Sequence, residues 1–276
     1  MNNISCIIFL SFSVPRPIEE QGTMIVYKLY RKITDGCDGK YVGMGGSLSF
    51  TSMARVLREL DIQGSNFMDF GCAHGQAMLA AWKSGAFSVV GYDLPGNKAQ
   101  KYIFDAVLAK LAAPAINHAQ WIPQDIDQVF FVFDFCAVDV LLHFDFCSQM
   151  TDNVFFSFPQ LTEIPIGSNT AFAFWVGMPF LTQQRILELC AVCHTMKAIA
   201  VFRDRKWPKP GEGRAYAFNY PSRLPPLTVD ACMLAVLAIL NDFGTAGSQK
   251  WYCDKTMRTT MLGSRERKTA WIFKRQ

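Results

Sequence analysis

Residues 66–76 read NFMDFGCAHGQ, and this stretch decides the fold. Its first five residues form a short apolar run that predicts a buried strand, which Gly71 ends in a tight turn. From Gln76 to Lys83 the apolar spacing predicts a helix, and Gly85 terminates it. A strand, a glycine turn and a helix in this order are typical of an open α/β sheet, in which ligands bind at the carboxyl ends of the strands.

Strand and helix patterns alternate on both sides of this stretch. Residues 49–60 predict an amphipathic helix with Ser49 or Thr51 as its N-cap. The pattern predicts an α/β fold with a mostly parallel sheet. It resembles the Rossmann-like, seven-stranded sheet of class I methyltransferases, which ends in an antiparallel C-terminal hairpin. The other expected elements are strands at 88–92, 117–122, 170–176 and 196–202, helices at 97–111, 181–193 and 229–240, and a closing hairpin of 256–262 with 268–274.

Length and composition bound the class of protein. The chain has 276 residues, of which 50% are hydrophobic and 18% are charged. It can therefore bury a large core, and disordered, collagen-like and coiled-coil structures are excluded. The nine cysteines are sparse and irregularly spaced, which favours reduced thiols inside a cell. The apolar residues 4–14 are too few to span a bilayer, so we expect no membrane partner.

A glycine loop and two acidic strand ends indicate the ligand. Gly71 and Gly75 let the backbone approach a ligand closely, and the helix that follows offers unpaired N–H groups. Asp93 ends the next strand, where a carboxylate accepts hydrogen bonds from both ribose hydroxyls. Asp125 and Ile126 follow the third strand, in position to meet an adenine ring. NAD-binding proteins share the first two features, but the G-x-G-x-x-G spacing of dinucleotide sites is absent here, which favours S-adenosylmethionine.

The stretch from residue 45 to residue 102 resembles the disruptor-of-telomeric-silencing (Dot-one) family of histone methyltransferases. The family's first loop corresponds to residues 45–50, and its cofactor loop, D-L-G-S-G-V-G-Q, to residues 69–76. Its acidic strand end, followed by a Pro and a Lys-Tyr pair, corresponds to residues 93–102. The chain departs from the family in the first loop, where Ser47 replaces an acidic residue and Gly45 an aromatic one.

The resemblance implies S-adenosylmethionine as the cofactor. It also implies two regions, an N-terminal arm with a cofactor-covering loop at 1–47 and a class I methyltransferase domain at 48–276. Residues 127–168 of that domain are an uncertain Phe-rich insertion, since they are crowded with Phe and follow no regular period. The cofactor-binding residues that follow are Ser47, Leu48, Asp69, Gly71, Cys72, Ala73, His74, Gly75, Gln76, Asp93, Leu94, Lys98, Asp125 and Ile126.

The family further implies the reaction, which is methyl transfer to a lysine of the globular core of histone H3 in the nucleus. Such a displacement needs aligned reactants and the exclusion of water more than it needs a strong acid. An apolar aromatic channel helps the lysine to lose its proton, because it destabilises the ammonium. We assign Phe174, Trp175 and Tyr41 to this channel, with Phe180 beside them. The segment after the fourth strand has no literal match to the family's Asn-Asn-Phe loop.

Other functions stay open from the sequence. The histone or nucleosome is the expected partner, but an RNA or another protein is an alternative acceptor, and the location is then cytoplasmic. A catalytically silent chromatin-binding module is a further alternative. Basic residues from Arg203 to Arg214 and from Lys250 to Arg275 are candidates for nucleic-acid phosphate contacts or are solvated surface. Cys190, Cys193 and His194 match a haem-attachment pattern at a helix end, and we expect neither haem nor a metal.

Overall fold

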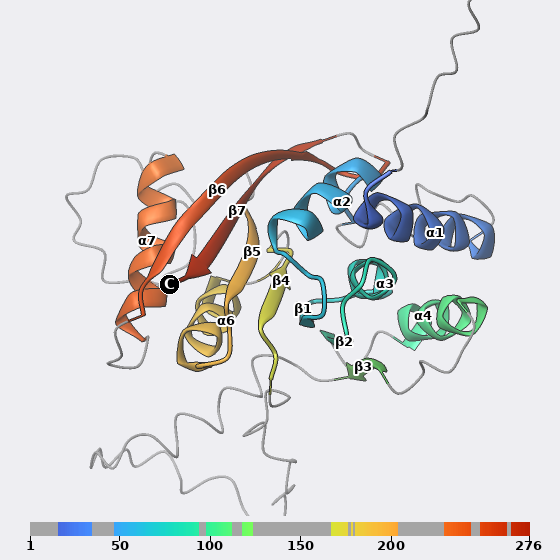
Figure 1. Cartoon of the computed structure of the whole chain (residues 1–276), viewed down its shortest axis with the longest axis horizontal. Helices are drawn as coiled ribbons and strands as arrows, with labels where there is room; N and C mark the ends of the chain where they lie inside the picture. The colour runs from blue at the N-terminus through green and yellow to red at the C-terminus, as the bar shows by residue number, and fades with distance from the viewer. Residues whose placement is uncertain are drawn as a thin grey trace, which may run out of the picture.

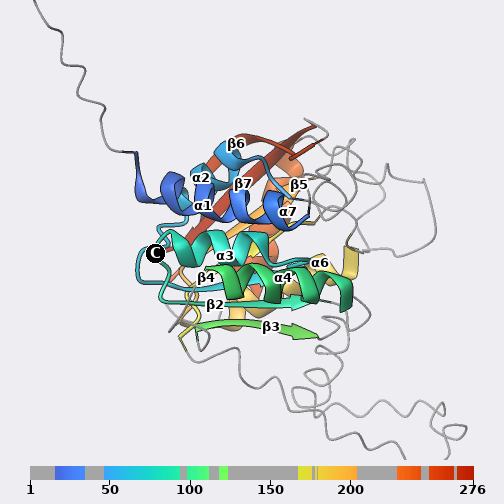
Figure 2. The same cartoon turned by 90° about the vertical axis from the view of Figure 1, so that its right-hand side faces the viewer.

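The computed structural model describes residues 16–34, 47–93, 98–111, 118–123, 167–175, 178, 180–203, 229–243, 249–263 and 266–276. In this part of the chain a seven-stranded sheet lies between two layers of helices (Figures 1 and 2). The strands are β1 Asn66–Phe70, β2 Ser88–Asp93, β3 Ala119–Pro123, β4 Thr170–Ala173, β5 Ala198–Arg203, β6 Trp251–Thr260 and β7 Arg267–Arg275. The helices are α1 Ile18–Ile33, α2 Phe50–Glu59, α3 Gln76–Lys83, α4 Lys98–Lys110, α6 Phe180–Val192 and α7 Val229–Asp242.

The strand order is β3-β2-β1-β4-β5-β7-β6. Strands β1 to β5 run parallel, and β7 is antiparallel to both of its neighbours, β5 and β6. The order reverses between β1 and β4, so the carboxyl ends of these strands form the switch point at which open α/β sheets bind ligands. The predicted fold class, with its antiparallel C-terminal hairpin, is confirmed.

The two faces of the sheet have separate hydrophobic layers. One layer packs beneath α1 to α4 and contains Val26, Leu57, Leu79 and Phe104, all almost fully buried. The other packs beneath α6 and α7 and contains Ile186 and Val236, among others. Figure 2 shows α1, α3 and α4 side by side in front of the strands. Strands β1, β2, β4 and β5 are nearly continuous apolar runs because both faces of the sheet are covered there.

Most predicted elements lie where the sequence places them. The bounds of β1 and α3 agree with the prediction, and those of α2, β2, α4, β3, α6, β5 and α7 differ by one or two residues at an end. Strand β4 ends at Ala173, three residues earlier than expected. Strand β6 begins at Trp251 instead of residue 256, and its pairing with β7 shifts between Cys253 and Lys255. This irregularity hides the alternating pattern of the strand's first half.

Helix α1 is the element that the sequence analysis did not predict. Its first turn holds Glu19 and Glu20 and its last turn Arg31 and Lys32, which suits the helix dipole. It packs along α3 closely enough that a Cβ at Gly22 would lie 2.5 Å from the carbonyl oxygen of Lys83. The helix is therefore part of the core layer, while the domain boundary at residue 47 remains a prediction.

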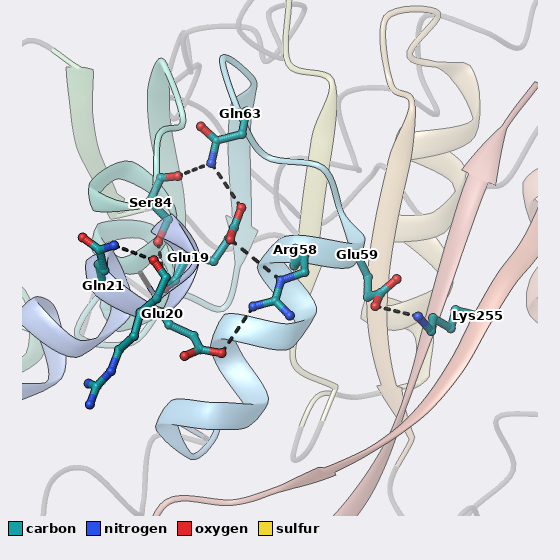
Figure 3. Close-up of polar contacts among 9 residues, drawn as sticks. Glu19, Glu20, Gln21, Arg58, Glu59, Gln63, Ser84 and Lys255 are labelled. Carbon is teal, nitrogen blue, oxygen red and sulfur yellow. Dashed lines mark hydrogen bonds and ion pairs between the residues drawn. The ribbon is translucent and has the colours of Figure 1, made fainter. Parts of the chain in front are cut away.

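Polar contacts fix the N-terminal end of α1 (Figure 3). The guanidinium of Arg58 on α2 lies 3.8 Å from a carboxylate oxygen of Glu19 and 3.3 Å from one of Glu20. The Gln63 amide donates to Glu19 at 3.2 Å and to the carbonyl of Ser84 at 2.6 Å. These contacts join α1, α2 and the end of α3 on the surface of the molecule. No helix in the described ranges has both the length and the apolarity needed to cross a bilayer.

Candidate functional site

The loop between β1 and α3 turns by means of three left-handed residues. Gly71 has φ +75°, Ala73 +47° and Gly75 +71°. The N–H groups of Gly71 and Cys72 both donate to the carbonyl of Tyr92, at 2.9 and 3.0 Å, which ties the loop to the end of β2. Alanine in this conformation costs about 1–2 kcal/mol, so the loop keeps its shape against local strain. Gly75 is the N-cap of α3, which turns the first N–H groups of that helix toward the carboxyl edge of the sheet.

Two side chains from other elements hold the outer part of this loop. The indole of Trp121 on β3 donates to the carbonyl of Ala73 at 2.8 Å. The hydroxyl of Tyr30 on α1 donates to the carbonyl of His74, and the two rings meet edge to face at 6.2 Å between their centroids. Neither residue was predicted to contact this loop, because the contacts join segments that are far apart in the sequence.

Two carboxylates lie buried at the ends of β1 and β2. Asp69 is 2% exposed and Asp93 is 8% exposed. Burial raises the pKa of the Asp69 carboxyl well above its usual range, and the charge of Asp93 raises it further. One oxygen of Asp69 has no hydrogen-bond partner among the described residues. Burial, followed by the charges of Asp69 and Asp93, also raises the pKa of the Cys72 thiol. A ligand that brings hydrogen-bond donors fits such a site.

Further buried polar atoms at this edge are unpaired within the described structure. Gln76 is 3% exposed, and both its amide oxygen and its amide nitrogen lack a partner. Trp175 is also 3% exposed, and its indole N–H has none. Buried polar groups are normally satisfied, so these atoms are candidates for ligand contacts. Other unpaired buried atoms of the described structure belong to Thr23, Gln100, Trp251, Trp271 and Arg275. In the described residues no group of three or more side chains gathers that can hold a metal ion.

The predicted first loop is anchored next to a small cavity. Leu48 is fully buried and pairs with Met261 in an isolated antiparallel bridge, while the Ser47 carbonyl accepts from the N–H of Leu262 at 2.9 Å. The hydroxyl of Tyr27 donates to the carbonyl of Leu48 at 2.5 Å. The cavity has a volume of about 250 Å³ and is lined by Met24, Tyr27, Lys28, Tyr30, Arg31, Phe50, Gln76 and Leu262. We call it the α1 pocket.

The structure does not bring the two described members of the predicted aromatic channel together. Phe174 packs against Phe202, with 5.2 Å between ring centroids, in the layer beneath α1 to α4. Trp175 lies in the layer on the opposite face of the sheet. Met178 instead lies close to the cofactor loop, since a Cβ at Gly71 would come within 2.3 Å of its methyl group.

The remaining predicted residues divide into two groups. Lys98 is the exposed first residue of α4. Tyr41, Leu94, Asp125 and Ile126 lie outside the described residues, as do residues 204–214 of the first basic segment, and they stay predictions.

Much of the basic C-terminal hairpin is neutralised locally. Lys255 pairs with Glu59 at 2.6 Å, Lys274 with Asp254 at 2.9 Å and Lys268 with Glu266 at 2.8 Å. The contact with Asp254 raises the pKa of Lys274. Arg275 donates to the carbonyls of Cys193 and Ala191 at the end of α6, which suits the helix dipole there. The described part of the hairpin therefore has fewer cations available to bind phosphate than the number of its basic residues suggests.

Comparison with known proteins defines the class of fold. No family model and no curated protein matches the sequence. A protein from Pyrococcus horikoshii assigned as an RNA methyltransferase superposes with a TM-score of 0.50 and 9% identity, over 93% of this chain and 97% of its own. A Streptococcus mutans protein assigned as an S-adenosylmethionine-dependent methyltransferase superposes with a TM-score of 0.46 and 10% identity, over 81% of this chain and 48% of its own. A protein assigned as a methyltransferase and complexed with S-adenosylhomocysteine superposes with a TM-score of 0.46 and 10% identity, over 80% of this chain and 49% of its own.

The chain therefore has the Rossmann-like fold of the class I methyltransferases, on the evidence of its strand order and of the Pyrococcus structure. It spans about half the length of the other two proteins. These similarities are similarities of fold, and they do not reach the Dot-one family in particular.

Proposed function

We propose that the chain is an S-adenosylmethionine-dependent methyltransferase. The observation that carries the proposal is the carboxyl edge of β1 and β2, where a strained glycine loop meets two buried acidic strand ends. Asp93 would accept hydrogen bonds from the ribose hydroxyls of the cofactor, and the unpaired oxygen of Asp69 would accept one from a donor of the ligand or of an ordered water.

The residues present fit the cofactor. At Gly71 the position of a Cβ is already filled by Met178, whose methyl group lies 2.3 Å from it, so the cofactor would approach the loop backbone when this flexible side chain turns away. The first turn of α3 presents backbone N–H groups to the same edge. The bound cofactor supplies an activated methyl group on its sulfonium. The chain's own residues hold that group, orient the acceptor toward it and exclude water.

Two classes of acceptor stand within this proposal. The resemblance of residues 45–102 to the Dot-one family supports a lysine of the histone H3 core, with the nucleosome as partner and the nucleus as location. The lining of the α1 pocket supports an RNA base, because the exposed Lys28 and the partly exposed rings of Tyr27 and Phe50 belong to it. In either case, phosphate contacts through the basic residues of the C-terminal hairpin remain part of the proposal.

The test is transfer of a labelled methyl group from S-adenosylmethionine to nucleosomes, free histones and total RNA. We expect wild type to label one acceptor class and Asp93→Ala to label it at least about 100-fold less, since the change removes two hydrogen bonds to a charged group, each of which contributes about 1.5–3 kcal/mol. The matched control is Asp105→Ala, which removes an exposed carboxylate paired with Lys101 on α4 and should leave the rate unchanged. Equal rates for Asp93→Ala and wild type would contradict the assignment of the ribose site. If the folded wild-type protein binds no cofactor, the proposed enzyme function is wrong, and the catalytically silent binding module is the remaining hypothesis.

A further inference from the structure

The walls of the α1 pocket are mostly aromatic. Tyr27 and Phe50 meet edge to face with 6.2 Å between ring centroids, and Tyr30 adds a third ring. The hydroxyls of the two tyrosines are engaged with the carbonyls of Leu48 and His74, so the pocket is lined by their rings. Its volume of about 250 Å³ is below the range of about 300–1,000 Å³ that is typical of drug-sized ligands, so it fits one ring system.

Gln76 supplies the buried polar group of the pocket. Its carboxamide has an unpaired donor and an unpaired acceptor side by side, at 3% exposure of the residue. Leaving both buried without partners costs free energy, so the pocket favours an occupant that offers one acceptor and one donor in a plane. The edge of a nucleobase has this pattern, and Gln pairs with adenine in this bidentate way in nucleic-acid complexes.

The charges at the pocket disfavour an ammonium group. Lys28 is an exposed cation of α1 beside the pocket, and none of the described residues that line the pocket is acidic. A lysine side chain, or the amino-acid end of the cofactor, would bring an ammonium that needs an anionic or multiple-acceptor partner. A neutral base needs none, and its flanking phosphates would meet Lys28, whose side chain is exposed at the surface of α1.

The pocket shares a wall with the cofactor loop. Gln76 is the first residue of α3, directly after the loop, and Tyr30 donates to the carbonyl of His74 within it. Figure 1 shows the turn end of the β6–β7 hairpin beside α2. Leu262, at the start of that turn, is one of the residues that line the pocket. The pocket therefore lies next to the place where the proposed function puts the methyl donor.

We infer that the α1 pocket binds a single unpaired base of an RNA strand, with Gln76 reading the edge of the base and Lys28 a neighbouring phosphate. The partly exposed rings of Tyr27 and Phe50 would then contact the base, as aromatic side chains do in other single-strand binders, and Tyr30, at 1% exposure, supports the wall behind them. The inference rests on the proposed function in taking this base as the methyl acceptor. It names the substrate class of that same site.

The test measures the binding of fluorescently labelled ten-nucleotide oligo(A), oligo(C) and oligo(U) by anisotropy. We expect wild type to prefer one of the three and Gln76→Leu to bind that one about tenfold more weakly, with the preference lost. Gln249→Leu is the matched control, because it makes the same change at an exposed position at the opposite edge of the sheet and should keep the wild-type preference. Lys28→Ala, a surface change that does not endanger folding, should weaken binding to all three equally and lower the salt dependence by about one phosphate contact.

Two results would overturn the inference. One is a wild type that binds the three oligonucleotides equally or not at all, and the other is a Gln76→Leu variant that keeps the wild-type order of preference. Calorimetric titration of S-adenosylhomocysteine separates this failure from failure of the proposed function. If the protein binds the cofactor and methylates histone H3 but not RNA, the inference of a base as acceptor is wrong and the proposed methyltransferase function stands. If the protein binds RNA with base selectivity but does not bind the cofactor, the proposed methyltransferase function is wrong, and so is the assignment of the base as methyl acceptor.

Discussion

The two ends of the parallel strands differ in how their polar groups are paired. At the carboxyl edge, the buried side chains of Asp69, Gln76 and Trp175 all have atoms without partners in the described structure. At the amino edge, the Nε1 atom of Trp251 and the Nε atom of Arg275 also lack partners in the described structure, but the side chain of Asn66 closes hydrogen bonds from strand to strand. The N–H of Asn66 donates to Asn169 at 3.1 Å, and its side chain donates to the Gly167 carbonyl at 2.9 Å and accepts from Ser88 at 2.7 Å.

The difference assigns separate roles to the two edges. A network that is closed within the protein contributes to stability and leaves little for a ligand. Unpaired buried groups reduce stability, and a ligand that pairs with them recovers the lost free energy. Changes at the carboxyl edge should therefore alter binding more than stability, and changes at the amino edge should do the reverse.

The largest effect is expected from Gly71→Val. The new side chain would have to adopt φ +75° and would place its Cβ 2.3 Å from the methyl group of Met178, within the space proposed for the cofactor. We expect S-adenosylhomocysteine to bind at least about 100-fold more weakly, equivalent to about 2.7 kcal/mol. The control is Gly64→Val, which has φ +68° but open space around its Cβ. It should lose about 1–3 kcal/mol of stability and keep its affinity, and equal losses of affinity in both variants would contradict the comparison.

Asp69→Asn should move stability and binding in opposite directions. Because burial raises the pKa of Asp69, the folded protein holds this proton more tightly than the unfolded chain does. The stabilisation is complete below the unfolded pKa and is lost as the pH rises through the folded pKa. The neutral amide of the variant does not ionise, so the variant does not lose this free energy of unfolding as the pH rises. Chemical denaturation should therefore find the variant more stable than wild type at pH 8 and no more stable at pH 4. Calorimetry should find weaker cofactor binding, and a variant that is less stable at pH 8 would refute the argument.

Asn169→Ala tests the amino edge. The change removes the acceptor for the N–H of Asn66, which lies at the start of β1. A lost hydrogen bond with a partly buried partner costs about 1–2 kcal/mol, so urea unfolding should show a decrease of this size. The affinity for S-adenosylhomocysteine should stay within about twofold of wild type. A tenfold loss of affinity would show that the two edges are coupled.

The smallest effect is expected from Ala73→Gly. Glycine adopts the left-handed conformation of this residue freely, which recovers about 1–2 kcal/mol, and its greater freedom in the unfolded chain costs about 0.5–1 kcal/mol. A net stabilisation of about 0.5 kcal/mol should result, whereas Ala→Gly substitutions ordinarily destabilise. Thermal unfolding measures the sign, and a destabilised variant would mean that the loop is not strained at Ala73.

The sequence predicts the elements whose signals are local. Strand β1 and helix α3 were placed correctly, because their apolar spacing and the glycines between them lie within one short window. Asp69 and Asp93 follow from the same logic, since each stands at the end of a buried strand. Phe174 and Trp175 were assigned to one channel although neighbouring residues of an extended chain point to opposite faces.

Tertiary contacts account for what the sequence does not predict. Gly22 weakens the helical pattern of α1, and its reason is the close approach to Lys83, which no local pattern contains. The hydrogen bonds of Tyr30 and Trp121 to the cofactor loop likewise cross 44 and 48 residues of sequence. The sequence favoured a lysine acceptor through its resemblance to one family. The α1 pocket, which supports a base, is formed by residues from three helices and the β6–β7 turn.

Calorimetric titration of S-adenosylhomocysteine into wild type, Gly71→Val and Gly64→Val is the most direct test of the carboxyl edge as a cofactor site. The account predicts a Kd in the micromolar range for wild type and Gly64→Val and no measurable binding for Gly71→Val. Absence of binding to a folded wild type, or equal binding by all three proteins, would contradict it.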